Sequence, residues 1–100
     1  MNAAYVVAEI LVSNPEKYAA YLPLSSASLE KYGGKFLVRG GHRLQKEGGD
    51  ERHNENWRTV IVSFPNIEIA QNWYDSEAYK YAREIRIAHS DGRLFFVEGL

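Results

Sequence analysis

Arg39 is the residue whose type and surroundings most favour binding chemistry. It is followed by Gly40 and Gly41, which leave room beside it for a ligand or another backbone. A guanidinium inside a protein needs a carboxylate or a ligand anion, because an unpaired internal charge is very costly. Two interpretations stay open: Arg39 clamps the carboxylate of a small substrate, or it forms a structural ion pair with Glu9 or Glu98.

Strand alternation predicts which way Arg39 points. Successive side chains from Phe36 to Leu44 should face opposite sides of a sheet, so Leu37 and Arg39 share one face. We expect this to be the face that no helix covers. Glu9 and Ser63 would then join Arg39 in a cleft inside a dimer.

A second candidate group follows helical spacing in the last third of the chain. Tyr79, Arg83, Arg86 and Ser90 recur at i, i+4, i+7 and i+11, which is one stripe of a helix. Two arginines and a phenol on one stripe could border the mouth of a pocket. A solvated helix face is the simpler interpretation.

Histidine and cysteine usage argues against a bound metal. His42, His53 and His89 show no metal-ligand spacing, and the chain has no cysteine. His42 could act as a general base, since an imidazole titrates near neutral pH. Its alternation with Phe36 and Val38 favours instead a strand-end residue under a helix. We expect no intrinsic metal, haem or organic cofactor.

Composition indicates a single globular domain over residues 1–100. Hydrophobic residues make up 45% and charged residues 25% of the chain, and the net charge is -1. That balance argues against nucleic-acid binding, which needs a clustered basic excess. The apolar run Tyr5–Val12 is interrupted by Glu9 and is far shorter than the roughly 20 residues that span a bilayer. We expect a cytoplasmic protein without membrane contact.

Local signals divide the chain into four strands and two helical regions. Asn14 and Pro15 should start the first helix, Pro23 should kink or divide it, and Gly33-Gly34 should end it. Asn66 should cap the second helix and Ser76 should restart it, up to about His89. A loop is expected at Glu47–Asn56 and a turn at Asp91-Gly92. The four expected strands are Tyr5–Val12, Phe36–Leu44, Trp57–Phe64 and Leu94–Glu98.

The order β-α-β-β-α-β predicts a ferredoxin-like α+β fold: a four-stranded antiparallel sheet with both helical regions on one face. Alternation predicts one strongly apolar face under the helices, made of Val6, Ala8, Ile10, Val12, Val60, Val62 and Phe64. The other face is about half apolar, with Tyr5, Val7, Glu9, Leu11, Trp57, Thr59, Ile61 and Ser63. A soluble monomer rarely exposes such a patch, so we expect two copies to pair sheet to sheet as a homodimer. An open-faced sheet with scattered apolar residues is the alternative.

Three segments carry a resemblance to a known family. Tyr32–Gly41 reads YGGKFLVRGG, Phe64-Pro65 is followed by Trp73-Tyr74 and by Ser76–Tyr79, and the third segment is Val97–Gly99 at the end of the closing strand. The sequence resembles the family called domain of unknown function 1330, a branch of the dimeric α/β-barrel superfamily. This resemblance implies the ferredoxin-like fold and a face-to-face dimer, and it implies no established activity. The superfamily includes cofactor-independent monooxygenases, muconolactone-type isomerases and haem-degrading enzymes.

Two hypotheses for function follow. The first is a protein that binds or transforms a small organic acid or aromatic metabolite in a cleft of the dimeric barrel, without a cofactor. The second is a non-catalytic dimeric module for structure or ligand sensing. An Arg39 that no protein carboxylate pairs favours the first hypothesis. The candidate binding residues are Arg39, Glu9, Ser63, Tyr79, Arg86 and His42.

Overall fold

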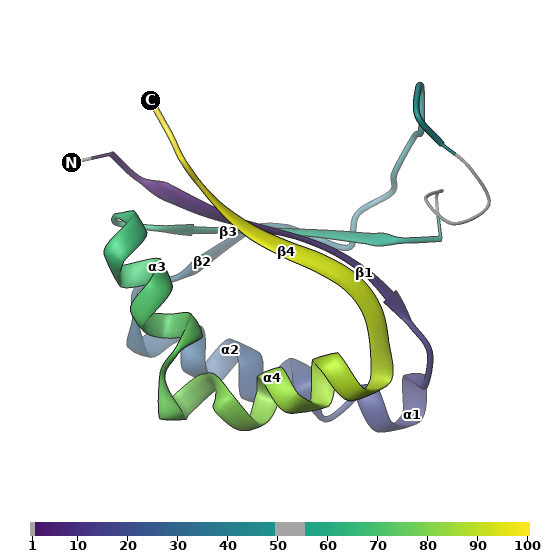
Figure 1. Cartoon of the computed structure of the whole chain (residues 1–100), viewed down its shortest axis with the longest axis horizontal. Helices are drawn as coiled ribbons and strands as arrows, with labels where there is room; N and C mark the ends of the chain where they lie inside the picture. The colour runs from purple at the N-terminus through teal and green to yellow at the C-terminus, as the bar shows by residue number, and fades with distance from the viewer. Residues whose placement is uncertain (1, 50–55) are drawn as a thin grey trace.

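The computed structural model describes residues 2–49 and 56–100, so most of the expected loop Glu47–Asn56, with His53, lies outside the described residues. The sheet has four antiparallel strands in the order β2-β3-β1-β4, and the helices lie together on one of its faces (Figure 1). This is the expected ferredoxin-like arrangement. The elements are β1 (Ala4–Val12), α1 (Pro15–Tyr18), α2 (Tyr21–Lys31), β2 (Lys35–Arg39), β3 (Arg58–Phe64), α3 (Ile67–Tyr74), α4 (Glu77–His89) and β4 (Ser90–Glu98).

The first helical region is divided, as Pro23 predicts. The side chain of Asn14 accepts a hydrogen bond from the backbone N–H of Lys17 at 3.1 Å, and α1 ends at Tyr18. The helix resumes at Tyr21, so Pro23 falls in the first turn of α2. The N–H groups of a first turn have no partner within the helix, and a proline there costs no hydrogen bond.

The second helical region is divided by the predicted caps. Asn66 accepts a hydrogen bond from the backbone N–H of Ile69 at 2.9 Å and starts α3. Ser76 accepts one from the backbone N–H of Tyr79 at 3.2 Å and starts α4. Both expected starts are confirmed.

The core lies between the helices and the predicted apolar face of the sheet. Val6 pairs with Val62 and Ala8 with Val60 across β1 and β3, and the side chains of this face are mostly buried. Trp73 of α3 packs on them and donates its indole N–H to the hydroxyl of Ser28 at 3.0 Å. A buried indole needs such a partner. This packing fixes α2 and α3 above the sheet.

The opposite face carries a continuous apolar row. Register places Val38, Ile61, Val7 and Phe95 side by side, one from each strand. Val7, Val38 and Ile61 are half-buried, while Phe95 is exposed. No helix of the described residues covers this row (Figure 1). Trp57, expected on this face, lies just before β3 and is buried.

Strand β2 differs from the prediction in length and in regularity. It ends at Arg39, not at Leu44. Phe36 pairs with Val62 and Val38 with Ile61, so Leu37 is one extra residue in the ladder. Such a β-bulge reverses the alternation of the residues that follow it.

Strand β4 begins directly after α4, so the expected turn at Asp91-Gly92 is wrong. Both residues lie inside the strand, and Gly92 is opposite Ile10 of β1. A Cβ on Gly92 would overlap the backbone carbonyl oxygen of Glu9 and lie 3.3 Å from the Cα of Ile10. Glycine is therefore used here for close approach of two strands, not for a turn.

Among the helices of the described residues, none is long and apolar enough to cross a membrane.

Candidate functional site

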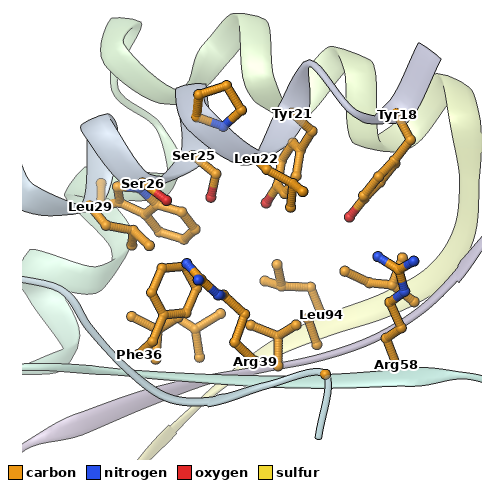
Figure 2. Close-up of a pocket in the computed structure, with 18 residues that line it drawn as sticks. Tyr18, Tyr21, Leu22, Ser25, Ser26, Leu29, Phe36, Arg39, Arg58 and Leu94 are labelled. Carbon is orange, nitrogen blue, oxygen red and sulfur yellow. The ribbon is translucent and has the colours of Figure 1, made fainter. Parts of the chain in front are cut away.

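A cavity of about 520 Å³ lies between α2 and the sheet (Figure 2). This volume is typical of small-molecule sites. Much of its wall is apolar, including Leu29, Phe36, Val62, Trp73 and Leu94. The few polar groups of the wall determine which ligands the cavity can bind.

Arg39 lines this cavity, and its predicted face is wrong. Because of the bulge, Arg39 lies opposite Val60 on the helix side of the sheet. Its guanidinium carbon lies 4.8 Å from the ring centroid of Phe36, which shares that side. Figure 2 shows the side chain rising from the strands into the cavity. Simple alternation failed because it does not count the extra residue Leu37.

Arg58 provides a second cation that the sequence analysis missed. It opens β3, pairs with Ile10 and lines the cavity at the end of the sheet where Arg39 closes β2. The signal was present, because Arg58 shares its alternation with the half-buried Val60 and the buried Val62. A charged residue at that parity points toward the helices and not toward the uncovered face.

Hydroxyl groups face these cations from the helical wall. Tyr18 of α1 and Tyr21 and Ser25 of α2 are buried, and Figure 2 shows their oxygens directed into the cavity. Burial raises the pKa of Tyr18 to about 12, and the neighbouring Tyr21 adds to this rise. Tyr18 is thus a neutral hydroxyl at ordinary pH, able to donate a hydrogen bond to an anion.

Within residues 2–49 and 56–100, no carboxylate lines the cavity, and neither Arg39 nor Arg58 has an ion-pair partner. Both arginines are exposed to solvent, so water hydrates the guanidinium groups in place of an ion-pair partner. The described cavity wall therefore presents two positive charges and several hydroxyl donors. Such a wall is suited to an anionic group attached to an apolar body.

Tyr79 and Arg86 form a buried chain behind this wall, so the solvated-face interpretation is wrong. Tyr79 is fully buried and Arg86 exposes 7% of its surface. The Nε of Arg86 donates to the hydroxyl of Tyr79 at 3.3 Å, whose oxygen lies 2.7 Å from that of Tyr21. Arg83, from the same predicted stripe, instead donates to the carbonyl oxygen of Tyr74 at 2.8 Å.

Glu9 and Ser63 do not meet Arg39. Both lie on the uncovered face, Glu9 opposite Thr59 and Ser63 opposite Tyr5. The carboxylate of Glu9 accepts a hydrogen bond from Nε of Arg93 at 2.7 Å and lies 3.5 Å from Arg43. The expected structural pair between Arg39 and Glu9 is therefore wrong, and Glu98 does not pair with Arg39 either.

Two of the three histidines, His42 and His89, lie within the described residues. His42 is exposed and follows the end of β2, so the expectation that it lies under a helix is wrong. It does not line the cavity. His89 ends α4. In the described part of the chain, no three histidine, aspartate or glutamate side chains gather to hold a metal ion.

Solved structures share this fold across nearly the whole chain. A protein of unknown function from Rhodopseudomonas palustris is 24% identical with a TM-score of 0.75, covering 99% of this chain and 83% of that one. SnoaB, a cofactor-independent oxygenase from Streptomyces nogalater, is 12% identical with a TM-score of 0.66, covering 100% and 95%. A dimeric ferredoxin-like protein of unknown function from Jannaschia sp. CCS1 is 12% identical with a TM-score of 0.67, covering 98% of each chain. At these identities the likeness shows the fold alone.

No curated protein matches the chain. The family model described as domain of unknown function (DUF1330) matches residues 3–100. That match spans both helical regions, all four strands and every cavity residue named above. The chain belongs to the DUF1330 family.

Proposed function

We propose that this protein binds a small organic acid with a flat, apolar body in the cavity between α2 and the sheet. Arg39 and Arg58 hold the acid group, and the aromatic and aliphatic wall holds the body. The observation that carries the proposal is the pair of guanidinium groups at a cavity whose described wall contains no carboxylate. Charge-assisted hydrogen bonds are roughly twice as strong as neutral ones, and the planar guanidinium of arginine matches the geometry of a carboxylate.

The shape of the wall supports the apolar body. Phe36 and Trp73 offer ring surfaces, while Leu29 and Leu94 fill the space between them. Aromatic side chains prefer offset or edge-on contact with another ring. A benzoate-like acid would therefore satisfy the charged and the apolar parts of the cavity together. SnoaB is an oxygenase on this fold, which is compatible with small-molecule binding here but is only an analogy.

The test compares carboxylates with their neutral amides in wild type and in Arg39→Met. A panel of aromatic monocarboxylates should raise the melting temperature of the wild type, and the matching amides should not. Arg39→Met should weaken carboxylate binding by about 1.5–3 kcal/mol, the usual contribution of a hydrogen bond to a charged group. It should change stability by no more than about 1 kcal/mol, because its described contact is a cation–π pair with Phe36.

Lys35→Met is the matched control. It removes one positive charge from the same strand, but Lys35 pairs with Ser63 on the opposite face. This variant should bind carboxylates like the wild type. If no carboxylate binds the wild type, the proposal fails and the non-catalytic module becomes the better hypothesis. Equal weakening in both variants would mean that net charge, and not Arg39, sets the affinity.

We infer in addition that two copies pair through the uncovered sheet face. The row formed by Val38, Ile61, Val7 and Phe95 supplies the apolar surface for this pairing. The Glu9–Arg93 pair lies next to it on the same face. The existence of a dimeric relative supports the inference. In such a dimer the cavities lie on the outer, helical sides of the sheets, one in each copy.

A further inference from the structure

A chain of three hydrogen-bonding groups leads from the protein interior to the cavity. It starts at the buried guanidinium of Arg86, passes through the fully buried Tyr79 and ends at Tyr21, which lines the cavity. The distances are 3.3 Å from Arg86 Nε to Tyr79 Oη and 2.7 Å between the two phenol oxygens. Only Tyr21 of these three groups faces the space where a ligand would lie.

The chemistry of the groups sets the direction of the hydrogen bonds. A guanidinium can only donate, so the oxygen of Tyr79 accepts from Arg86. The hydroxyl hydrogen of Tyr79 also needs an acceptor, because the group is buried. Across the described residues, the oxygen of Tyr21 is the acceptor that the structure provides. Tyr79 therefore donates to Tyr21, and the hydrogen of Tyr21 is left to point into the cavity.

Resting on the proposed function, we propose that Tyr21 is an oriented hydrogen-bond donor that selects acids carrying a second acceptor oxygen, such as a ketone carbonyl. The acid group is held by Arg39 and Arg58 on the strand wall. Tyr21 approaches from the opposite, helical wall, as Figure 2 shows. The substrate class is thus an aromatic oxo acid, with its carbonyl and carboxylate directed to opposite walls.

Arg86 acts as a positioning residue in this arrangement. Its charge polarises Tyr79 and, through it, Tyr21, because successive hydrogen bonds in a chain strengthen one another. Burial raises the pKa of Tyr79 well above its usual value, so its hydroxyl stays protonated and keeps donating. A neutral side chain at position 86 would leave Tyr79 free to turn its hydrogen away from Tyr21.

The experiment uses acids of equal shape that differ only in the acceptor. The ortho, meta and para isomers of acetylbenzoate are compared with the corresponding ethylbenzoates by calorimetric titration. In wild type, at least one acetyl isomer should bind about three- to tenfold more tightly than its ethyl partner, the effect of one hydrogen bond. Tyr21→Phe should remove this preference and still bind the ethylbenzoate.

Tyr32→Phe is the matched control, because Tyr32 is a partly buried phenol that packs against the core and does not line the cavity. It should keep the preference. Arg86→Met should reduce the preference and Arg86→Lys should restore part of it. As a readout in the wild type itself, the infrared band of an isotope-labelled acetyl carbonyl should move to lower frequency on binding, and not in Tyr21→Phe.

The outcomes separate this inference from the proposed function. Ethyl and acetyl acids that bind the wild type equally, for all three isomers, would overturn the role of Tyr21 and leave acid binding standing. The same comparison is made in Tyr18→Phe, which removes the other phenol that lines the cavity. If Tyr18→Phe loses the preference and Tyr21→Phe keeps it, the donor is Tyr18 and the proposed role of Tyr21 is wrong. Failure of all six acids to bind the wild type would remove the proposed function and this inference with it.

Discussion

Gly92→Ala tests how closely β4 approaches β1. The new methyl group would overlap the carbonyl oxygen of Glu9 and meet the Cα of Ile10 at 3.3 Å. All of these neighbours are backbone atoms, so no side-chain rotation can relieve the contact. Overpacking costs typically 1–3 kcal/mol and occasionally more, while replacing glycine recovers about 0.4–1 kcal/mol from the unfolded chain. We expect a net loss of about 1–2 kcal/mol.

Gly41→Ala is the control for the entropy of the unfolded chain. A Cβ on Gly41 would meet no atom within 4 Å, and its φ lies outside the left-handed region. Its stability should rise by no more than about 1 kcal/mol, which is the gain from the unfolded chain alone. For a domain of this size, 1 kcal/mol shifts the melting temperature by about 4–8 °C. Calorimetry at equal protein concentration should thus show a fall of roughly 5–15 °C for Gly92→Ala alone. Equal melting temperatures in the two variants would refute the close approach.

Two further predictions concern the dimer and alkaline pH. Ile61→Glu puts a charge in the middle of the apolar row and should give the monomer mass in sedimentation at micromolar concentration. The control Ile87→Glu, on the exposed side of α4, should stay dimeric. A wild type that sediments as a monomer would contradict the pairing. The pKa of Tyr18 is about 12 in the folded protein, against about 10 when unfolded, so the unfolded state loses this proton first and stability falls as the pH rises between these values. Urea unfolding should show that the free energy of unfolding falls less at alkaline pH in Tyr18→Phe than in wild type. In the control Tyr81→Phe, whose side chain is exposed, it should fall as much as in wild type. An identical fall in all three proteins would show that Tyr18 does not contribute.

The fold could be predicted from local signals because each element carries its own. Asn14, Asn66 and Ser76 cap helices where expected, and their side chains make the expected hydrogen bonds. The alternation of Val6 and Val62 identified the face that the helices cover. These features depend on neighbours along the chain, which a sequence displays directly. The turn assigned to Asp91-Gly92 failed because glycine marks both turns and close strand contacts.

The site could be predicted only in part, because it depends on register and on distant segments. Arg39 was identified for its charge and its glycine neighbours, but the bulge in β2 placed it on the other face. Tyr18 and Tyr21 come from helices far from Arg58 in sequence, so local patterns do not indicate that they face the same cavity. The stripe with Arg86 was found by its spacing. The burial of Arg86 was missed because tertiary packing, and not the sequence spacing, decides which side of a helix is covered.

The bulge at Leu37 has a consequence for comparing this sequence with its relatives. Pairing on both sides of the bulge is regular, with Phe36 opposite Val62 and Arg39 opposite Val60. A relative that lacks one residue at this point would close the ladder without moving the arginine out of the cavity. When such a shorter relative is aligned with this chain, the gap belongs inside this strand and not at its ends. For such a shorter relative, an ungapped alignment would pair the arginine with a residue that faces the other layer of the fold, and it would misplace the proposed binding site in that chain.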